Sequence, residues 1–328
     1  MKWRTIAIIR GMENSAVRVR VPATSANLGP GFDTLGMALQ LYSYVIVQDS
    51  PSGQHRVIME GEGQEYGERP IEDNIAWQAI VKLAEATQVD LPPLQLTLQN
   101  TIPLSRGLGS SAAARMGALV AANLWLERAG KSHLDQEQLL RLATEMEGHP
   151  DNVAPALHGG MICSASDGGK VLSTRLAIPA WPRFLAFIPN DALETKSARA
   201  VLPQSISHVD AVFNLSRLGL LISAISNGAW RSNPALLRTA LQDRLHQIYR
   251  AALMPAYGPV EEAALKAGAL GVTLSGAGPS ILIWLSDDVK STFVDTMKNV
   301  VLQTAAERNV SGKIIELDVD EEGCVEVE

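Results

Sequence analysis

The sequence is poor in cysteine, in aromatic side chains and in basic charge. Two cysteines among 328 residues are too few for a disulfide framework, which favours a reducing compartment, the cytoplasm. Lysine and arginine number 28 against 35 acidic residues; this argues against a nucleic-acid-binding protein, which needs a basic face. No apolar run of membrane-spanning length is evident, so we expect no membrane partner. The apolar 46% is mostly aliphatic and suits packed layers of helices and strands.

Length and composition predict two domains after a short extension. A chain of 328 residues exceeds the usual size of one domain. Residues 1–15 are expected to be an N-terminal extension, because the first alternating strand begins at residue 16. Their short apolar stretch ends in arginine without a cleavage site, which argues against a signal peptide. The proline-rich segment 178–182 is the best candidate boundary. We therefore expect a first domain over 16–180 and a second over 181–328.

Hydrophobic periodicity predicts strands interleaved with helices. Regular β-α-β crossovers are few, so we expect an α+β fold rather than a Rossmann-type sheet. Asp73 is expected to cap a helix with Ile75 and Ala79 on one face, and the acidic tail 318–328 to be a solvated terminus. Strands are expected at 16–21, 42–48, 54–60, 94–99, 161–165, 171–176, 184–188, 271–274, 281–285 and 313–319. Further helices are expected at 110–128, 134–146, 207–226, 234–249, 260–267 and 288–306.

The strongest chemical signal is the segment from Pro103 to Ala113. Gly107 and Gly109 can adopt backbone conformations that a side chain would block, so that successive amides can turn inward as an anion-binding nest. The segment leads into an alanine-rich helix, whose N-terminal partial charge would point at the same spot. It lacks the Lys-Ser/Thr pair of a Walker A loop and the third glycine of the dinucleotide fingerprint. The functional interpretation is a phosphate-binding loop, and the structural alternative is a tightly packed helix cap.

Two further glycine-rich segments give this loop a family context. They are PATSANLGPGFDTLG at 22–36 and TLSGAGPS at 273–280. Together with the central loop, they resemble the three motifs of the GHMP kinases, in that family's order and at its separations, over essentially the whole chain from about residue 16. Within the family, EGHPDNVAP, YRAALMP and the first motif resemble the homoserine kinase branch. The resemblance implies a two-domain α+β GHMP-kinase fold, with a ribosomal-protein-like N-terminal domain and a ferredoxin-like C-terminal domain.

The resemblance also implies an activity, which is transfer of the ATP γ-phosphoryl group to the hydroxyl of L-homoserine in threonine biosynthesis. Asn74 would contact the nucleotide, although a helix cap explains it equally well. Ser111 and Glu147 would hold Mg²⁺, because a hydroxyl and a carboxylate suit a hard cation; Glu145 is the rival carboxylate. The ATP phosphates would be wrapped by Pro103, Leu104, Ser105, Arg106, Gly107, Leu108, Gly109, Ser110, Ser111, Ala112 and Ala113.

The acceptor site is carried over by the same resemblance. Arg199 and Arg250 would clamp the carboxylate of the acceptor, since guanidinium forks suit carboxylates. Its amino group and hydroxyl would be framed by Asn27, Asp33, Asp151 and Thr195. Each of these residues taken alone has an ordinary structural explanation, such as a turn in a glycine-rich loop.

Catalysis would rest on Ser111, Asp151 and Asn152. Asn152 would orient the attacking hydroxyl. Asp151 is expected to bind substrate first and to act as a general base second, because a loose transition state requires little early proton transfer. His149 is interpreted as a loop residue, since the sequence suggests no neighbour that would orient its ring.

Two other functions stay open. One is a GHMP kinase for a mevalonate-like or sugar acceptor, which the arginine pair disfavours. The other is a non-catalytic nucleotide-sensing or RNA-binding module, which the acidic balance and the set of Ser111, Glu147 and Arg199 disfavour. The sequence leaves the oligomeric state open, a homodimer included.

Overall fold

Alternating valines begin the first sheet. In the computed structural model, which describes residues 16–328, Val17, Val19 and Val21 are fully buried while Arg18 and Arg20 reach the surface, as a half-buried strand requires. In this part of the chain the sheet runs in the order β11-β1-β2-β4-β3, with β5 on β2 and β6 on β5. Its strands are β1 (Val17–Ala26), β2 (Leu35–Asp49), β3 (Arg56–Gly61), β4 (Leu94–Asn100), β5 (Met161–Asp167), β6 (Lys170–Arg175) and β11 (Val325–Glu326). The expected extension at 1–15 lies outside the described residues.

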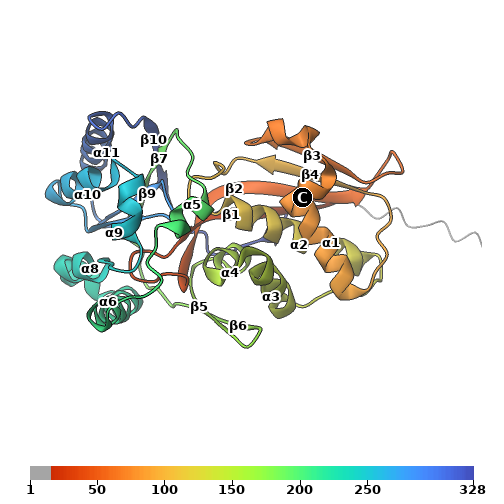
Figure 1. The fold of residues 1–328 in the computed structure, drawn as a ribbon, viewed down its shortest axis with the longest axis horizontal. Coiled ribbons are helices and arrows are strands. Elements are labelled where there is room, and N and C mark those ends of the chain that lie inside the picture. Colours follow the sequence, from red (N-terminus) through yellow and green to blue (C-terminus); the bar gives the residue numbers. More distant parts are fainter. Residues whose placement is uncertain (1–15) are drawn as a thin grey trace, which may run out of the picture.

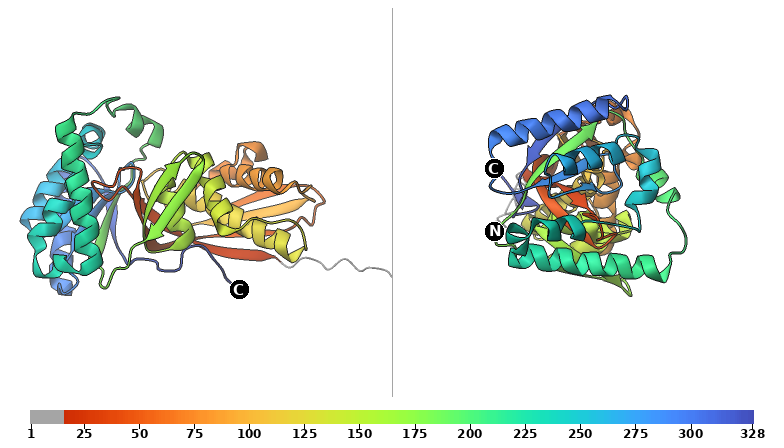
Figure 2. Two further views of the ribbon diagram at one scale, coloured as in Figure 1. Left: turned by 90° about the horizontal axis from the view of Figure 1, so that it is seen from below. Right: turned by 90° about the vertical axis from the view of Figure 1, so that its left-hand side faces the viewer.

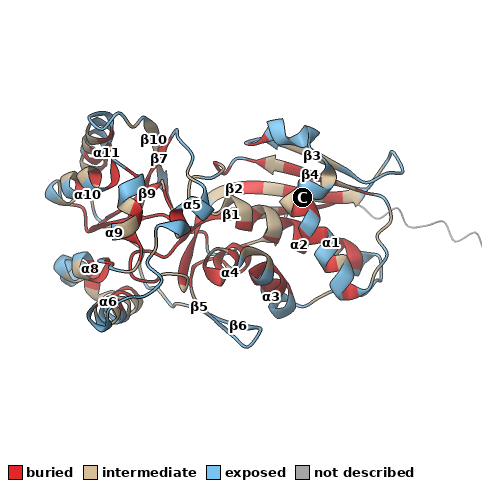
Figure 3. Cartoon of the chain, viewed as in Figure 1, coloured by how far each residue is buried: buried red, intermediate tan, exposed pale blue. Residues whose placement is uncertain are grey.

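Four helices lie together over this sheet (Figure 1), and they are α1 (Ile75–Thr87), α2 (Ser110–Arg128), α3 (Gln136–Glu147) and α4 (Pro150–His158). The central helix α2 is buried along most of its length. A Cβ at Gly117 would press on Val45 and Val21, so glycine lets this helix approach the strands closely. Figure 3 shows the buried faces of these helices turned toward the sheet.

Local details differ from the expectations at two helix starts. Asn74, rather than Asp73, caps α1: its Oδ1 accepts the N–H groups of Ala76 at 3.0 Å and Trp77 at 3.1 Å, while Asp73 ends a preceding 3₁₀ turn. The helix α4 was not expected. It begins with Pro150 at its first position, where the missing N–H of proline costs nothing.

The second half contains an antiparallel sheet in the order β10-β7-β9-β8. Its strands are β7 (Arg183–Pro189), β8 (Gly271–Leu274), β9 (Ile281–Leu285) and β10 (Gly312–Leu317). Every residue of β9 is buried, because both faces of the sheet are covered. Leu282 and Trp284 belong to the large core shared with α6 (His208–Asn227), α7 (Ala229–Ser232) and α8 (Pro234–Ala240). Ile283 faces the opposite way, into a core with α10 (Tyr257–Lys266) and α11 (Ser291–Ala306).

The prediction of one helix over 234–249 is wrong, because the helix is interrupted between α8 and α9 (Gln247–Arg250). Asp243 is the cause. Its carboxylate accepts the backbone N–H groups of Leu245, His246 and Gln247, and an aspartate that captures amides in this way competes with helical hydrogen bonds.

The acidic tail is not a solvated terminus, contrary to the expectation. The strand β11 pairs with β1 in the first sheet, so the C-terminal residues return to the N-terminal half, where Figure 2 shows that end of the chain. Asp320 is buried and accepts hydrogen bonds from Tyr42 Oη and from the N–H groups of Glu322 and Gly323. A buried aspartate with this many donors is well satisfied.

One surface helix is more apolar than expected. By length and composition α6 could cross a membrane, so the expectation of no such segment is wrong. In this structure α6 packs against α8, and its outer face exposes Val209 and Leu215, each 70% accessible. A single helix of this kind does not by itself assign the chain to a membrane.

Candidate active site

A cleft of about 120 Å³ brings the three glycine-rich segments together. The loop at 27–34 leaves the first sheet and reaches the second half, where Asn214 and His246 contact the carbonyl groups of Pro30 and Gly29. The helix α5 (Thr195–Ala200) lies between the two halves (Figure 1). The cleft is lined by Asn27, Asp33, Ser105, Gly107, Gly109, Ser110, Ser111, Glu147, His149, Asp151, Asn152, Thr195, Arg199, Arg250, Gly276 and Ala277.

The central loop is shaped by glycine at two positions. Gly107 and Gly109 have φ values of 74° and 69°, in the left-handed region that favours glycine. A Cβ at Gly107 would overlap the carbonyl oxygen of Ser275, and one at Gly109 would overlap Thr24 Oγ1. The third motif supports the loop, because Ser275 Oγ donates to Gly107 O at 2.7 Å.

The central loop leads directly into α2, and Gly109, Ser110 and Ser111 at the start of this helix line the cleft. Gly109 occupies the N-cap and brings no side chain to it, which suits an anion at the helix N-terminus. Not every expected loop residue lines the cleft. Leu108, Ala112 and Ala113 are buried in the core, and the guanidinium of Arg106 bonds the carbonyl groups of Leu104 and Asn190. Pro103 is also buried. These five residues therefore contribute to the packing of the loop and do not line the cleft.

Ser111 and Glu147, the two residues predicted to hold a metal ion, lie in contact, with Ser111 Oγ donating to Glu147 Oε2 at 3.1 Å. Glu145 lies elsewhere, exposed and paired with Arg141 at 2.6 Å. Arg115 also lies here and was not predicted from the sequence. This residue follows Ser111 by one helical turn, so that its Nη1 contacts Ser111 Oγ at 2.7 Å and also Glu147 Oε2. Burial lowers the pKa of Arg115.

The two expected arginines differ in their partners. Arg199 forms a two-pronged ion pair with Asp33, at 3.0 and 2.6 Å. Arg250 is only 2% exposed and donates to the carbonyl groups of Ala198 at 3.2 Å and Gly276 at 3.1 Å. Burial, with a smaller effect from the charge of Arg199, lowers the pKa of Arg250 to about 10.

Asn27 sets the geometry of the first motif. Its Oδ1 accepts the N–H of Asp33 at 3.0 Å and its Nδ2 donates to Gly276 O at 2.9 Å. Asn27 and Asp33 both have positive φ, 69° and 54°, a conformation that asparagine and aspartate tolerate better than most residues. This side chain thus joins the first motif to the third and holds the Asp33 carboxylate at the cleft.

Asp151 and Asn152 lie in the first turn of α4, which starts after His149. Asp151 is 1% exposed, and its Oδ1 contacts His149 Nδ1 and accepts from Asn152 Nδ2 at 3.3 Å. Asn152 Oδ1 in turn accepts from Thr24 Oγ1 at 2.7 Å. The expectation that nothing orients the His149 ring is therefore wrong. The ring nitrogen and the Asp33 and Asp151 carboxylates lie within 4.8 Å of one another.

A second cavity, of about 260 Å³, adjoins the first and shares Ser105, Ser110 and Ser111 with it. Its walls are largely apolar, and Asn74 lies at its edge, with Nδ2 3.5 Å from Met59 Sδ. Asn74, Leu104, Ser105, Ser110 and Ser111 were expected as nucleotide contacts, whereas the other lining residues were not predicted, because they come from strands, turns and helices outside the glycine-rich motifs. The second cavity is lined by Met59, Tyr66, Arg69, Asp73, Asn74, Ile75, Leu98, Asn100, Leu104, Ser105, Ser110, Ser111 and Ala114.

The chain is similar to known kinases over most of its length. Family models for the GHMP kinases N terminal domain and the GHMP kinases C terminal region match residues 74–160 and 221–300. The homoserine kinase of Desulfitobacterium hafniense is 43% identical over 310 residues, covering 94% of this chain and 99% of that protein. The homoserine kinase of Moorella thermoacetica is 45% identical over 264 residues, covering 80% and 86%.

Solved structures agree with these sequence comparisons. The homoserine kinase of Cytophaga hutchinsonii superposes with a TM-score of 0.83 at 27% identity, covering 100% of both chains. The mevalonate kinase of L. major superposes with a TM-score of 0.67 at 15% identity, covering 92% of this chain and 95% of that one. The latter likeness concerns the fold alone.

Proposed function

This chain belongs to the GHMP kinase family, and from that premise we propose that it transfers the γ-phosphoryl group of ATP to the side-chain hydroxyl of L-homoserine. The product is O-phospho-L-homoserine, an intermediate of threonine biosynthesis. The observation that carries the proposal is the meeting, in one cleft, of a glycine-rich anion loop with Asp33, Arg199 and Arg250. That charge pattern suits an acceptor with both an ammonium and a carboxylate.

ATP would occupy both cavities. Its phosphates would lie at the loop around Gly107 and Gly109, where the N-terminal amides of α2 favour negative charge. Its base would lie in the second cavity, whose apolar walls include Met59, Tyr66 and Leu98. Since the two cavities share three serines, one nucleotide can extend from one to the other.

The residues present fit a magnesium ion. Ser111 Oγ and Glu147 Oε2 are oxygen ligands 3.1 Å apart, and a hydroxyl with a carboxylate is a donor set that Mg²⁺ takes, with water and phosphate oxygens. We assign these two side chains to Mg²⁺, which when bound would neutralise charge on the phosphates. Arg115 contacts the same two oxygens and keeps the Glu147 carboxylate paired within the protein.

The acceptor would divide the existing ion pair between its own charges. Asp33 would take the ammonium of homoserine, while Arg199 and Arg250 would take its carboxylate. Each charged side chain thus keeps a partner of opposite sign when the substrate binds. Because Asp33 and Arg199 are already paired with each other, part of the free-energy cost of removing them from water has been met before binding. Thr195 lines the same cleft and would add a hydroxyl beside the substrate.

At the reacting hydroxyl, Asn152 and Asp151 have distinct roles. Thr24 fixes one end of the Asn152 amide, so that its other end can orient the attacking oxygen. Asp151 would hold the substrate first and receive its proton second, because phosphoryl transfer depends mainly on positioning and charge stabilisation. The contact with His149 fixes the orientation of the Asp151 carboxylate.

The substrate assignment is tested by ADP release in a coupled assay over a panel of alcohols. We expect turnover of L-homoserine to exceed that of mevalonate and galactose by orders of magnitude. Mevalonate lacks the ammonium that Asp33 is proposed to bind, and galactose lacks both the ammonium and the carboxylate that Arg199 and Arg250 are proposed to bind. Phosphorylation of mevalonate with none of homoserine would overturn the proposal.

The cytoplasmic location and the homodimer stay predictions. Sedimentation equilibrium separates a monomer of 35.2 kDa from a particle of about twice that mass.

A further inference from the structure

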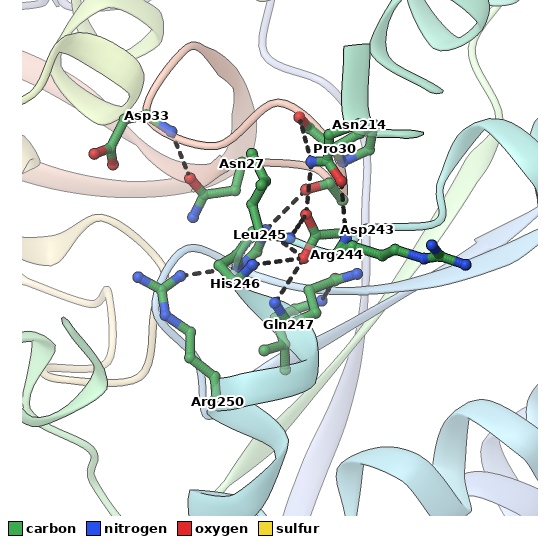
Figure 4. Close-up of polar contacts among 12 residues, drawn as sticks. Asn27, Pro30, Asp33, Asn214, Asp243, Arg244, Leu245, His246, Gln247 and Arg250 are labelled. Atoms are coloured by element: carbon green, nitrogen blue, oxygen red, sulfur yellow. Dashed lines mark hydrogen bonds and ion pairs between the residues drawn. The ribbon is translucent and has the colours of Figure 1, made fainter. Parts of the chain in front are cut away.

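The ring of His246 lies between Arg250 and the loop that carries Asn27 and Asp33, which are both assigned to the proposed acceptor site (Figure 4). It is fully buried. Its Nε2 is 2.8 Å from the carbonyl oxygen of Gly29, in the loop that carries Asn27 and Asp33. Its Nδ1 is 3.1 Å from Nη1 of Arg250, one helical turn along α9. The ring therefore contacts Arg250 directly and also contacts the backbone of the loop that carries Asp33.

These two contacts determine where the ring holds its proton. A carbonyl oxygen can only accept a hydrogen bond and a guanidinium can only donate. The Nε2 atom must therefore carry the hydrogen, and Nδ1 must present its lone pair to Arg250. An imidazolium would turn a donor and a positive charge toward Arg250. Burial lowers the pKa of His246, outweighing the opposite influence of Asp243, in agreement with a neutral ring.

The ring is held rigidly from several sides. Asp243 accepts the backbone N–H groups of His246 at 2.9 Å and Gln247 at 2.7 Å, which fixes the start of α9. Phe32 stacks on the ring, with centroids 5.3 Å apart and planes at 25°. The Phe32 ring also lies 5.4 Å from the Arg250 guanidinium carbon. Ring orientation is thus set by packing and by backbone contacts.

The partners of Arg250 share one property. Among residues 16–328 its hydrogen-bond partners are the carbonyl groups of Ala198 and Gly276 and the neutral ring of His246. Arg199, in contrast, is neutralised by Asp33. A neutral acceptor can aim a guanidinium without consuming its charge, whereas a carboxylate would compete with the ligand.

We propose that neutral His246 is a positioning residue, which aims the Arg250 guanidinium at the carboxylate of the acceptor and ties it to the loop of Asn27 and Asp33. This inference rests on the proposed function. His246 has no assigned contact with the substrate and acts through Arg250.

Two near-isosteric variants separate the two contacts of the ring. In His246→Asn the amide oxygen lies near the place of Nδ1 and can accept from Arg250, while the contact with Gly29 is lost. In His246→Gln the amide nitrogen reaches the place of Nε2 and can donate to Gly29, while Arg250 loses its acceptor. Both variants remove the stacked ring, so each controls for the packing loss of the other.

We expect His246→Gln to raise the KM for homoserine about tenfold, the effect of one hydrogen bond to a charged group. The KM for ATP and kcat should stay within about twofold of wild type. His246→Asn should keep the homoserine KM within about threefold. In an Arg250→Leu background, His246→Gln should change the homoserine KM no further, because the group through which it acts is absent.

Equal effects of both variants on the homoserine KM, or a full further increase in the Arg250→Leu background, would overturn the inference. If Arg250→Leu raises that KM and His246→Gln does not, the inference alone fails. If the wild type does not phosphorylate homoserine, the proposed function fails with it. A measurement without substitution gives a second test: ¹⁵N spectra of histidine-labelled wild-type protein at pH 7 should show a buried neutral ring protonated at Nε2. An imidazolium or the Nδ1-protonated form there would refute the inference even if both variants misfold.

Discussion

Replacing Arg250 by leucine is the most direct perturbation of the proposed acceptor site. At neutral pH the guanidinium is charged, because even its lowered pKa is about 10. Loss of a charged hydrogen bond to a carboxylate costs about 1.5–3 kcal/mol, which corresponds to a rise in the homoserine KM of roughly ten- to 150-fold. Arg199 still offers a second fork to the carboxylate, so we expect a value at the lower end.

The same substitution has a structural cost that must be measured separately. It leaves the Ala198 carbonyl and the His246 Nδ1 atom without the Arg250 donor, whereas the Gly276 carbonyl keeps its hydrogen bond from Asn27 Nδ2. Each buried acceptor that loses its partner costs about 1–3 kcal/mol. We therefore expect a lower melting temperature as well as a higher KM. Arg250→Lys is the matched control, because it keeps the charge but loses the planar fork. Its KM for homoserine should lie between those of the wild type and Arg250→Leu.

The assay is steady-state ADP release at pH 7.5 with saturating ATP and varied homoserine, beside thermal unfolding of each variant. The ATP KM should change little, because Arg250 lies on the acceptor side of the cleft. An Arg250→Leu protein that unfolds cooperatively and retains the wild-type homoserine KM would refute the carboxylate clamp.

Three further predictions concern other parts of the molecule. Glu147→Gln should lower kcat at least tenfold with little change in the homoserine KM, whereas Glu145→Gln should leave both unchanged; the reverse would move the metal assignment to Glu145. Gly107→Ala should lower kcat/KM for ATP at least tenfold, because its Cβ would overlap Ser275 O, while Gly130→Ala, which has open space, should cost only about 1 kcal/mol of stability; equal ATP kinetics in the two would contradict the loop geometry. Burial and Arg175 lower the pKa of His158, so below about pH 6.5 the unfolded chain binds the proton that the folded chain excludes. The free energy of unfolding should therefore be lower at pH 5.5 than at pH 7.5, and the decrease should be smaller in His158→Asn. Denaturant titrations at both pH values measure this decrease, and an equal decrease in the wild type and the variant would contradict the prediction.

Elements with strong local patterns were predictable from the sequence. The alternating valines of β1 carry a clear period of two, and the long alanine- and leucine-rich run after Gly109 consists mostly of strong helix formers; both elements are present. The break after α8 was not predictable from periodicity, because it depends on Asp243 capturing the amides of residues that follow it. The pairing of β11 with β1 was also hidden, since a two-residue strand has too little pattern to identify.

The members of the site were more predictable than their partners. Short motifs bring Asp33, Glu147 and Asp151 to attention without any knowledge of the fold. The pair of Arg199 with Asp33 joins residues 166 positions apart, and no local signal specifies it. Arg115 could have been found, because a residue one turn after Ser111 faces the same side of a helix, but its placement beside Glu147 depends on how α2 and α3 pack.

The acidic composition and the anionic ligands are reconciled by how three arginines are paired. Arg115 and Arg199 are neutralised by Glu147 and Asp33, so they add little net potential to the cleft before substrate arrives. Arg250 makes its hydrogen bonds to neutral acceptors, although the charges of Asp33, Asp151 and Asp243 also act on it; we therefore expect it to be the arginine that is freest to bind an incoming carboxylate. The amides at the start of α2 supply the remaining positive potential for the phosphates. We therefore expect anion binding in the cleft to depend on the local pairing of charges rather than on the net charge of −7, because salt screens interactions with charges on distant surfaces.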